Sequence, residues 1–328
     1  TFYKKEATAQ QPATSKEEGN LVAFSGPDFK ATFDKQSGLL TSYLYKKHEY
    51  ILNGQGPRPF FWRAPTDNDY GANLPVRLKA WKEASYQEPK AESFQVTPGS
   101  NATTIKVTYR FPQTDARWDI TYKIYASGVI KVDNRFVAEG DQAPMIPRVG
   151  LRMQLPESFT DLTYYGRGPK ENYRDRRTSQ FIGEYAIPVK DMYEPYVRPQ
   201  ENNHRTDIYW CALTDKTQRG LLLIADRTFE LNASNYPLES MDSGDTIDNG
   251  APRTEKTHHR HLTDPLPEKM VDLFIDYRMM GVGGDDSWGA TAHEPYLIRP
   301  GKENAIEYGF SLVPFDKKED YKYLIRQY

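Results

Sequence analysis

The sequence predicts an all-β fold, a large antiparallel sandwich of two sheets. Many short segments alternate apolar and polar side chains with the period of two that marks a half-buried β-strand. The 22 glycines and 23 prolines lie mostly between these segments, as turn residues do. Only one segment has helical spacing, and strands do not alternate with helices, so a parallel sheet is not expected.

The N-terminal residues differ from the rest of the chain. Residues 1–20 are rich in lysine, glutamate, glutamine, threonine and alanine, so they are predicted to be a linker or a frayed tail of a preceding domain. No break in composition divides the remainder, and a single domain is predicted over residues 21–328. Thr1 is not an initiator residue and no apolar leader follows it, so the chain is expected to be cut from something longer.

The segments of this domain follow in order. A hairpin is predicted from residues 29–33 and 39–45, which flank a turn at 34–38. The one predicted helix covers residues 74–85, where apolar residues recur at helical spacing. Further strands are predicted over 105–111, 118–124, 129–137, 148–155, 206–213, 220–225, 270–280 and 304–313, and a long exposed loop over 236–256.

The composition argues against several classes of function, among them nucleic-acid binding and membrane association. A net charge of −2 gives no basic footprint for nucleic acid or for an anionic membrane, and no apolar run approaches the ~20 residues of a membrane span. The single cysteine, Cys211, excludes an internal disulfide and a cysteine-rich zinc site, but leaves a cytoplasmic or a periplasmic location open. Aromatic residues make up 13% of the chain, which suits sheets with wet outer faces or a surface that meets sugars.

Two stretches concentrate polar side chains at irregular backbone. Residues 60–71 place a permanent cation at Arg63, a turn at Pro65 and four polar residues directly after it. Because such side chains bond readily to nearby backbone, this stretch either ties a loop together or presents polar groups to a ligand. Residues 164–176 carry glycines, a proline and charges of alternating sign, which predict a tight connection held by ion pairs, with anion binding as the alternative.

Two further stretches carry candidate ligands. His259 and His261 would project from one side of a strand, which is metal-ligand geometry, although no third ligand is apparent and exposed histidines would give the same pattern. Residues 280–288 hold three glycines followed by Asp285, Asp286 and Trp288. A flat indole beside hydrogen-bonding groups is how proteins hold a sugar ring, but a tryptophan at a strand end is also a common core plug.

Signatures of several enzyme classes are missing from the sequence. There is no G-x-S-x-G nucleophile elbow, and neither a Walker nor a Rossmann fingerprint is present. No pair of carboxylates is marked out as acid and nucleophile. If the chain works on sugars, the residues alone favour contact over catalysis.

Five motifs, taken together and in order, resemble a known family. They are Phe61-Trp62-Arg63-Ala64-Pro65-Thr66-Asp67-Asn68-Asp69 with Gly71, Gly166-Arg167-Gly168-Pro169 with Glu171-Asn172-Tyr173 and Asp175-Arg176, Asp191-Met192-Tyr193 with Pro195-Tyr196-Val197, Pro199 and Glu201-Asn202, His259-Arg260-His261-Leu262, and Gly281-Val282-Gly283-Gly284-Asp285-Asp286-Ser287-Trp288. The chain resembles the C-terminal domain, or small chain, of LacZ-type family 2 β-galactosidases. The resemblance covers about residues 21–315.

The resemblance implies a fold and an activity. The fold would be a large β-sandwich like that of galactose mutarotase, and the enzyme would hydrolyse terminal β-D-galactosides with retention of configuration. Retaining hydrolysis uses two carboxylates about 5 Å apart, and in the family both lie on a TIM barrel that this chain lacks. No catalytic residue and no metal ligand is therefore assigned in this chain, which alone is predicted to be inactive.

The resemblance also implies site residues and partners. Trp288 would stack on substrate at the rim of the active site, with Asp285 and Asp286 supporting its loop. A mobile lid would start at Gly71, anchored by Asp67, Asn68 and Asp69. The partners would be the TIM barrel and N-terminal domains of the same enzyme and a β-galactoside, in a homo-oligomer whose Mg²⁺ and monovalent cation are bound mainly elsewhere.

Two other functions remain open on the sequence. A free-standing carbohydrate-binding module would use the same kind of β-sandwich to hold sugars. An aldose mutarotase would need a positioned acid and base, typically histidine and glutamate, and the separate candidate histidines are His48, His204, His259 and His293. None of them lies in a recognised mutarotase motif.

Overall fold

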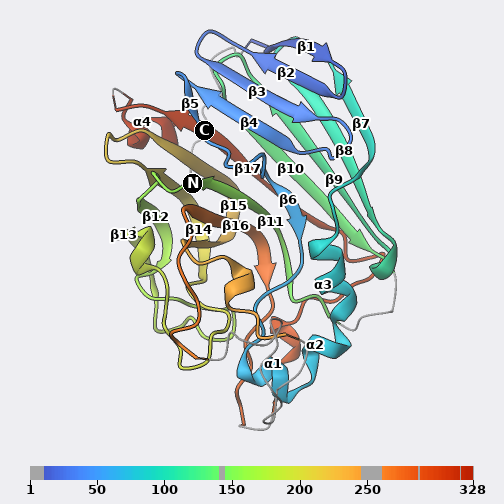
Figure 1. Cartoon of the computed structure of the whole chain (residues 1–328), viewed down its shortest axis with the longest axis vertical. Coiled ribbons are helices and arrows are strands. Elements are labelled where there is room, and N and C mark those ends of the chain that lie inside the picture. Colours follow the sequence, from blue (N-terminus) through green and yellow to red (C-terminus); the bar gives the residue numbers. More distant parts are fainter. Residues whose placement is uncertain (1–10, 140–144, 245–260, 287–288, 318, 328) are drawn as a thin grey trace.

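The computed structural model confirms the predicted all-β sandwich (Figure 1). The structure describes residues 11–139, 145–244, 261–286, 289–317 and 319–327. Every strand pair in these ranges is antiparallel, and the strands form one five-stranded and one twelve-stranded sheet. No helix in the described ranges has the length and apolar composition needed to cross a membrane.

The small sheet takes the first five strands in sequence order. Its strands are β1 (Thr14–Glu18), β2 (Leu21–Ser25), β3 (Phe29–Asp34), β4 (Leu40–Tyr45) and β5 (His48–Glu49). The prediction of a linker or frayed tail over residues 1–20 is wrong for residues 14–18, because they form strand β1 and pair with β2 along their whole length. All five side chains of β1 are exposed, so this edge strand carries none of the apolar alternation by which the other strands were found.

The large sheet is curled and encloses the core together with the small sheet (Figure 1). Its main path runs β13-β12-β14-β15-β17-β10-β9-β8-β7. The strands are β7 (Ala91–Thr97), β8 (Thr103–Phe111), β9 (Ala116–Ile124), β10 (Ile130–Ala138), β12 (Asp161–Gly168), β13 (Phe181–Pro188), β14 (Arg205–Thr214), β15 (Gly220–Ser234) and β17 (Ile306–Phe315).

The large sheet forks at β15, the longest strand. The first part of β15 pairs with β17, from Gly220 to Ala225, and the last part pairs with β16 (Met270–Met279), from Glu230 to Ser234. Beyond β16 the branch continues through β11 (Arg148–Pro156) to β6 (Arg58–Phe60). The residues between the two pairings, Asp226 to Thr228, are exposed or half-buried, so the fork opens the sheet to solvent at its middle.

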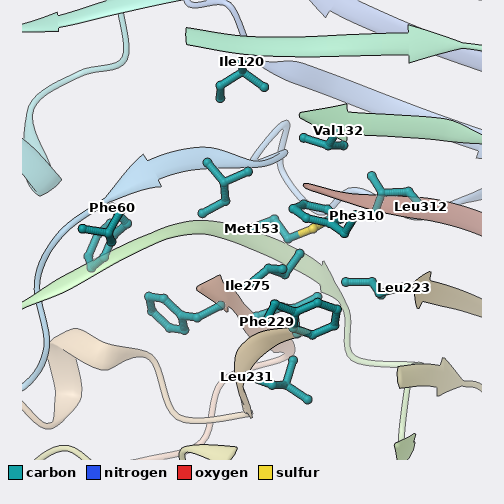
Figure 2. Close-up of a cluster of buried hydrophobic side chains, with 14 of the residues drawn as sticks. Phe60, Ile120, Val132, Met153, Leu223, Phe229, Leu231, Ile275, Phe310 and Leu312 are labelled. Atoms are coloured by element: carbon teal, nitrogen blue, oxygen red, sulfur yellow. The ribbon is translucent and has the colours of Figure 1, made fainter. Parts of the chain in front are cut away.

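The core fills the space between the two branches and under the small sheet. Figure 2 shows this packing, with Ile120 and Val132 of the main path facing Met153 of β11 and Ile275 of β16. Phe61 packs edge-on against Phe111 with ring centroids 4.9 Å apart. Burial of this many apolar side chains is the main stabilising term of such a sandwich.

Short helices interrupt the strands between β6 and β7. Within the described ranges the α-helices are α1 (Asp67–Gly71), α2 (Leu74–Arg77), α3 (Lys79–Tyr86) and α4 (Tyr321–Ile325), and the 3-10 turns are Pro112–Thr114, Val189–Asp191, Leu238–Ser240 and Glu294–Tyr296. The predicted helix over 74–85 is present but divided after Arg77, and Leu74, Leu78 and Trp81 are buried as expected.

Two other segments differ from prediction. Residues 161–168 form strand β12, although a connection was expected from 164 onward. The first part of the predicted exposed loop over 236–256 is folded, since Leu238 and Met241 are buried. The rest of that loop, from residue 245, lies outside the described residues.

Candidate functional site

Arg63 lies at the centre of the site and is almost fully buried. It enters from the end of the aromatic run after β6, and its Nε and Nη2 donate to the two carboxylate oxygens of Asp69 at 3.0 and 2.8 Å. A guanidinium and a carboxylate in this two-pronged geometry form a strong, directional pair. Desolvation lowers the pKa of Arg63, but the charge and hydrogen bonds of Asp69 outweigh it and raise that pKa overall, so Arg63 stays a fixed cation.

The local sequence brings Asp69 to this position through a helix start. Thr66 caps helix α1 by accepting from the Asp69 amide at 3.1 Å, while the Asp69 carboxylate accepts from the Thr66 amide at 3.0 Å. This reciprocal capping box needs a threonine and an acid three residues apart. Asp69 thus closes the helix and neutralises Arg63 with the same carboxylate.

Arg63 and helix α1 together hold the glycine-rich segment that follows β16. The Nη1 atom of Arg63 donates to the carbonyl of Met280 at 2.7 Å, and Nη2 donates to that of Gly281 at 3.1 Å. Asn68 donates to the carbonyl of Val282 at 3.1 Å. The polar stretch after Pro65 is therefore a structural knot, and the glycine-rich segment is what it secures.

Asp175 holds the same segment from the opposite side. Its two carboxylate oxygens accept from the amides of Val282 and Gly283 at 3.1 and 2.8 Å. A Cβ on Gly281 would lie 2.6 Å from the Asp175 carboxylate carbon, and Gly283 has a φ of +69°. These two glycines are needed because one allows the carboxylate to approach and the other allows the left-handed turn.

The end of the glycine-rich segment touches the predicted lid. Gly289 has a φ of +92°, and a Cβ there would overlap Gly71 and Ala72. The predicted lid residues Asp67, Asn68, Asp69 and Gly71 form helix α1, and only Ala72 and Asn73 separate it from α2. The connection after Gly71 is short, and the predicted lid role of these residues stays a prediction.

The other predicted site residues are Asp285, Asp286 and Trp288, and the structure describes only the first two. Asp285 and Asp286 are exposed, and Asp285 contacts His293 while Asp286 accepts from the Ala290 amide at 3.1 Å. Trp288, the predicted rim residue, lies outside the described residues. The structure therefore brings the supporting segments together on either side of Trp288.

Behind this site lies a buried ionic network that the sequence analysis did not predict. His204 is fully buried between Asn232, 2.6 Å from its Nδ1, and Glu230, 2.9 Å from its Nε2. The second oxygen of Glu230 contacts Arg174. Glu230 also accepts from the Met279 amide at 2.7 Å, so the network reaches the end of β16 where the glycine-rich segment begins.

Arg148 and Asp276 extend the network under the fork. Their Nε and Oδ2 atoms lie 3.2 Å apart, and both side chains are fully buried. The only sequence signal for them is that charged residues occur in strands rich in buried apolar side chains, Arg148 at the start of β11 and Asp276 within β16. That signal marks burial but does not identify the partner.

Burial and neighbouring charges shift the pKa values of this network. Desolvation raises the pKa of Asp276 to about 7, against the attraction of Arg148. Desolvation lowers the pKa of His204, but its hydrogen bond to Glu230 outweighs burial and raises it. Burial also raises the pKa of Glu230, but the bond from His204 outweighs it and holds that pKa below its usual range.

The network does not have the layout of an aldose mutarotase. His204 and Glu230 are a histidine and a glutamate, the residue types of such an acid and base, and they are bonded to each other. Each has at most 1% of its surface exposed, so neither reaches a sugar. An acid and a base must each lie within hydrogen-bond reach of the substrate, and this pair instead supports the fold.

The residues described form no cluster of histidine, cysteine and carboxylate that could hold a metal ion. His259, one of the two predicted ligands, lies outside those residues, and His261 is exposed in a turn. The proposed pairing of the two histidines on one face of a strand is therefore untested. Cys211 is a free, buried thiol.

Comparison with known proteins connects this geometry to a family. The family described as beta galactosidase small chain matches residues 25–312. Beta-galactosidases from Priestia megaterium and Halalkalibacterium halodurans are 33% and 30% identical over 88% and 89% of this chain. The aligned regions make up 26% and 27% of those proteins, so the chain spans about a quarter of the length of the curated relatives it matches.

A solved structure supports the fold. Galactose 1-epimerase from Lactobacillus acidophilus aligns over 94% of this chain and 99% of its own, with a TM-score of 0.50 and 7% identity. At this identity the likeness concerns the fold alone, and it agrees with the expected mutarotase-like sandwich.

Proposed function

The chain belongs to the β-galactosidase small chain family, and from this premise we propose that it is the C-terminal domain of a larger β-galactosidase. That enzyme removes terminal, non-reducing β-D-galactose residues with retention of configuration. The observation that carries the proposal is the family match over most of this chain, together with relatives about four times as long.

In this proposal the catalytic carboxylates lie on a TIM barrel elsewhere in the longer protein. The acids of the site described above support this division, because they are occupied by structural bonds. Asp69 pairs with Arg63, and Asp175 accepts two backbone amides. Neither has a free oxygen pair to serve as nucleophile or acid beside a sugar. The Mg²⁺ and monovalent cation of the whole enzyme would be bound mainly outside this domain.

The contribution of this domain is the rim of the active site, where Trp288 stacks on the substrate. The support for this role is the rigid anchorage on both sides of that residue. Arg63, Asn68 and Asp175 hold residues 280–283, and Gly289 packs on Gly71 and Ala72. A stacking residue contributes most when its backbone is fixed in advance.

The rim role is tested in the longer polypeptide by Trp288→Ala, with Trp288→Phe as the matched control. Loss of the ring should raise the KM for a chromogenic β-galactoside about tenfold, equivalent to about 1.4 kcal/mol. The phenylalanine variant should recover most of that loss because it keeps an aromatic face. A KM and kcat unchanged by the alanine variant would remove Trp288 from the substrate site.

A further inference from the structure

A polar groove lies at the fork of the large sheet. It has a volume of about 1050 Å³ and is bordered by β8, β9 and β10 on one side and by β14, β15 and β16 on the other. It exists because β15 leaves β17 after Ala225 and joins β16 only at Glu230. A register shift between Val149 and Gly150, opposite Arg278 and Asp276, marks a bulge in the same place. Bulges re-aim side chains, and here Tyr277 and Arg278 line the groove.

Contacts between strands fix the side chains that form the wall of the groove. Asp226, in the unpaired part of β15, reaches across β17 to Lys131 of β10 at 2.6 Å. Gly309 of β17 permits this crossing, since a Cβ there would lie 2.6 Å from the Lys131 ammonium and 2.8 Å from Asp133. The polar side chains of β9 and β10 alternate with core residues, so their outward direction is fixed by the pairing of the strands.

The carboxylates that line the groove are all paired with cations, whereas three of the lining cations make no ion pair with a described carboxylate. Each of its five carboxylates has a cation within ion-pair distance: Asp119 with Arg117, Asp133 and Asp226 with Lys131, Asp207 with Arg167, and Glu307 with Arg135. Three lining cations, Lys106, Arg227 and Arg278, have no carboxylate within that distance among the described residues. The Nε of Arg278 is buried and has no hydrogen-bond acceptor there either. These three cations make no direct ion pair there, and Lys106 acts on Asp119 only from a longer distance, helping to lower the pKa of that carboxyl.

The rest of the lining suits a sugar. Tyr277 and Tyr308 are half-buried in the groove with ring centroids 6.1 Å apart, and the Arg278 guanidinium lies 5.4 Å from the centroid of Tyr277. Such rings pack against the C–H face of a sugar, and paired carboxylates still accept from its hydroxyls. Five interspersed carboxylates would repel a dense polyanion such as nucleic acid, so the fitting ligand has few negative charges and many hydroxyls.

We propose that this groove binds an acidic oligosaccharide, whose carboxylate or sulfate groups pair with Lys106, Arg227 and Arg278 and whose rings pack on Tyr277 and Tyr308. The proposal uses other residues than those of the proposed rim and does not depend on the role of Trp288. It would hold a sugar chain on the domain while other parts of a longer enzyme act on it. The three cations come from β8, β15 and β16, so the distances between them would set the preferred charge spacing along the sugar chain.

The test is calorimetric titration of the 328-residue chain with three probes of similar length. These are oligogalacturonides, which carry carboxylates, sulfated galactan oligosaccharides, and neutral β-galactan oligosaccharides. At low salt, one acidic probe should bind at least about tenfold more tightly than the neutral one, and added salt should weaken it. The two acidic probes distinguish a carboxylate site from a sulfate site. Inorganic sulfate alone should bind weakly.

Three variants complete the test. Arg278→Gln and Arg227→Gln should each weaken the acidic probe about tenfold, the loss of one charge-assisted contact. Arg326→Gln, which changes an exposed arginine just after α4 and outside the groove, should leave binding unchanged. Thermal unfolding of each variant establishes that it is folded. Equal binding of the neutral probe, equal binding of inorganic sulfate, binding insensitive to both groove variants, or no acidic binding at low millimolar concentration would each overturn the proposal.

Discussion

Arg63 shows how much a single side chain organises in this domain. It is a buried cation with four hydrogen bonds, two to Asp69 and two to the carbonyls of Met280 and Gly281. A buried charge is tolerated only while its partner is ionised, and losing the partner leaves the remaining charge uncompensated. The clamp between helix α1 and the glycine-rich segment therefore depends on the carboxylate of Asp69.

Asp69→Asn should accordingly destabilise the domain by about 3 kcal/mol or more, because Arg63 would keep its charge without a counter-ion. Urea unfolding followed by circular dichroism measures the change. Asp67→Asn is the matched control two residues away, since Asp67 is exposed and lies 3.7 Å from Arg198. Its effect should stay within about 0.5 kcal/mol. Equal losses in the two variants would show that the clamp does not carry the stability assigned to it.

Asp276 makes stability depend on pH. Its pKa rises from an ordinary 3.8 to about 7 in the fold, mainly by desolvation. The folded state thus holds a proton that the unfolded state has released, so unfolding free energy should fall as pH rises from about 4 to about 7. The raised pKa of His204 acts in the same direction, because its stabilising contribution is lost as pH rises through the folded pKa.

Asp276→Asn should remove the part of this slope that Asp276 causes, up to about 1.4 kcal/mol per pH unit. The asparagine is neutral at every pH and matches the protonated acid in shape. The measurement is urea unfolding at intervals between pH 4 and pH 8 for both proteins, compared as the difference between them. A difference that is constant across this range would contradict a raised pKa at Asp276.

At the scale of elements, the glycine-rich segment after β16 depends on contacts from distant parts of the chain. Asp175 reaches it from the connection between β12 and β13, and α1 reaches it from between β6 and β7. Such loops at functional sites have low intrinsic stability and need tethers of this kind. The rim would be rigid only while these tethers are intact.

Asp175→Ala should free the amides of Val282 and Gly283, which then exchange hydrogen faster while the strands of the core keep their protection. Each lost bond to a charged acceptor is worth about 1.5–3 kcal/mol, so a change of about tenfold or more in local exchange is expected. Hydrogen exchange with peptide-level mass spectrometry reads the segment directly. Asp285→Asn, an exposed acid in the same segment, is the control and should leave these amides unchanged. Unaltered exchange in Asp175→Ala would mean that Arg63 and α1 fix the segment without Asp175.

At the scale of the whole molecule, the sequence predicts those parts of the fold where one face of a strand is wet and the other is core. Strands β8, β9 and β10 have that alternation, and Ile105, Trp118 and Val132 mark their buried faces. Strand β1 is fully exposed and β13 has no fully buried side chain, so neither strand presents a core face to detect. The fork of β15 also escaped prediction, because pairing of one strand with two neighbours depends on tertiary contacts.

The parts of the candidate site that depend on neighbouring residues were predictable, whereas the contacts between distant residues were not. The polar stretch after Pro65 was expected to tie a loop together, and its capping box is local in sequence. Its target was not predictable from spacing, since Arg63 and Met280 are far apart along the chain. The buried network escaped for the same reason, because His204, Glu230 and Asp276 come from three different strands or their flanks. The role of Trp288 remains a prediction.

The central claim is that this domain completes an active site whose catalytic carboxylates lie elsewhere in a longer protein. The most direct test is the initial rate at which the purified 328-residue chain hydrolyses a chromogenic β-galactoside. The account predicts no turnover above the uncatalysed rate, with the chain shown to be folded by its circular dichroism. Turnover at a rate typical of enzymes, about 1–1,000 per second, would place the catalytic carboxylates in this chain and contradict the account.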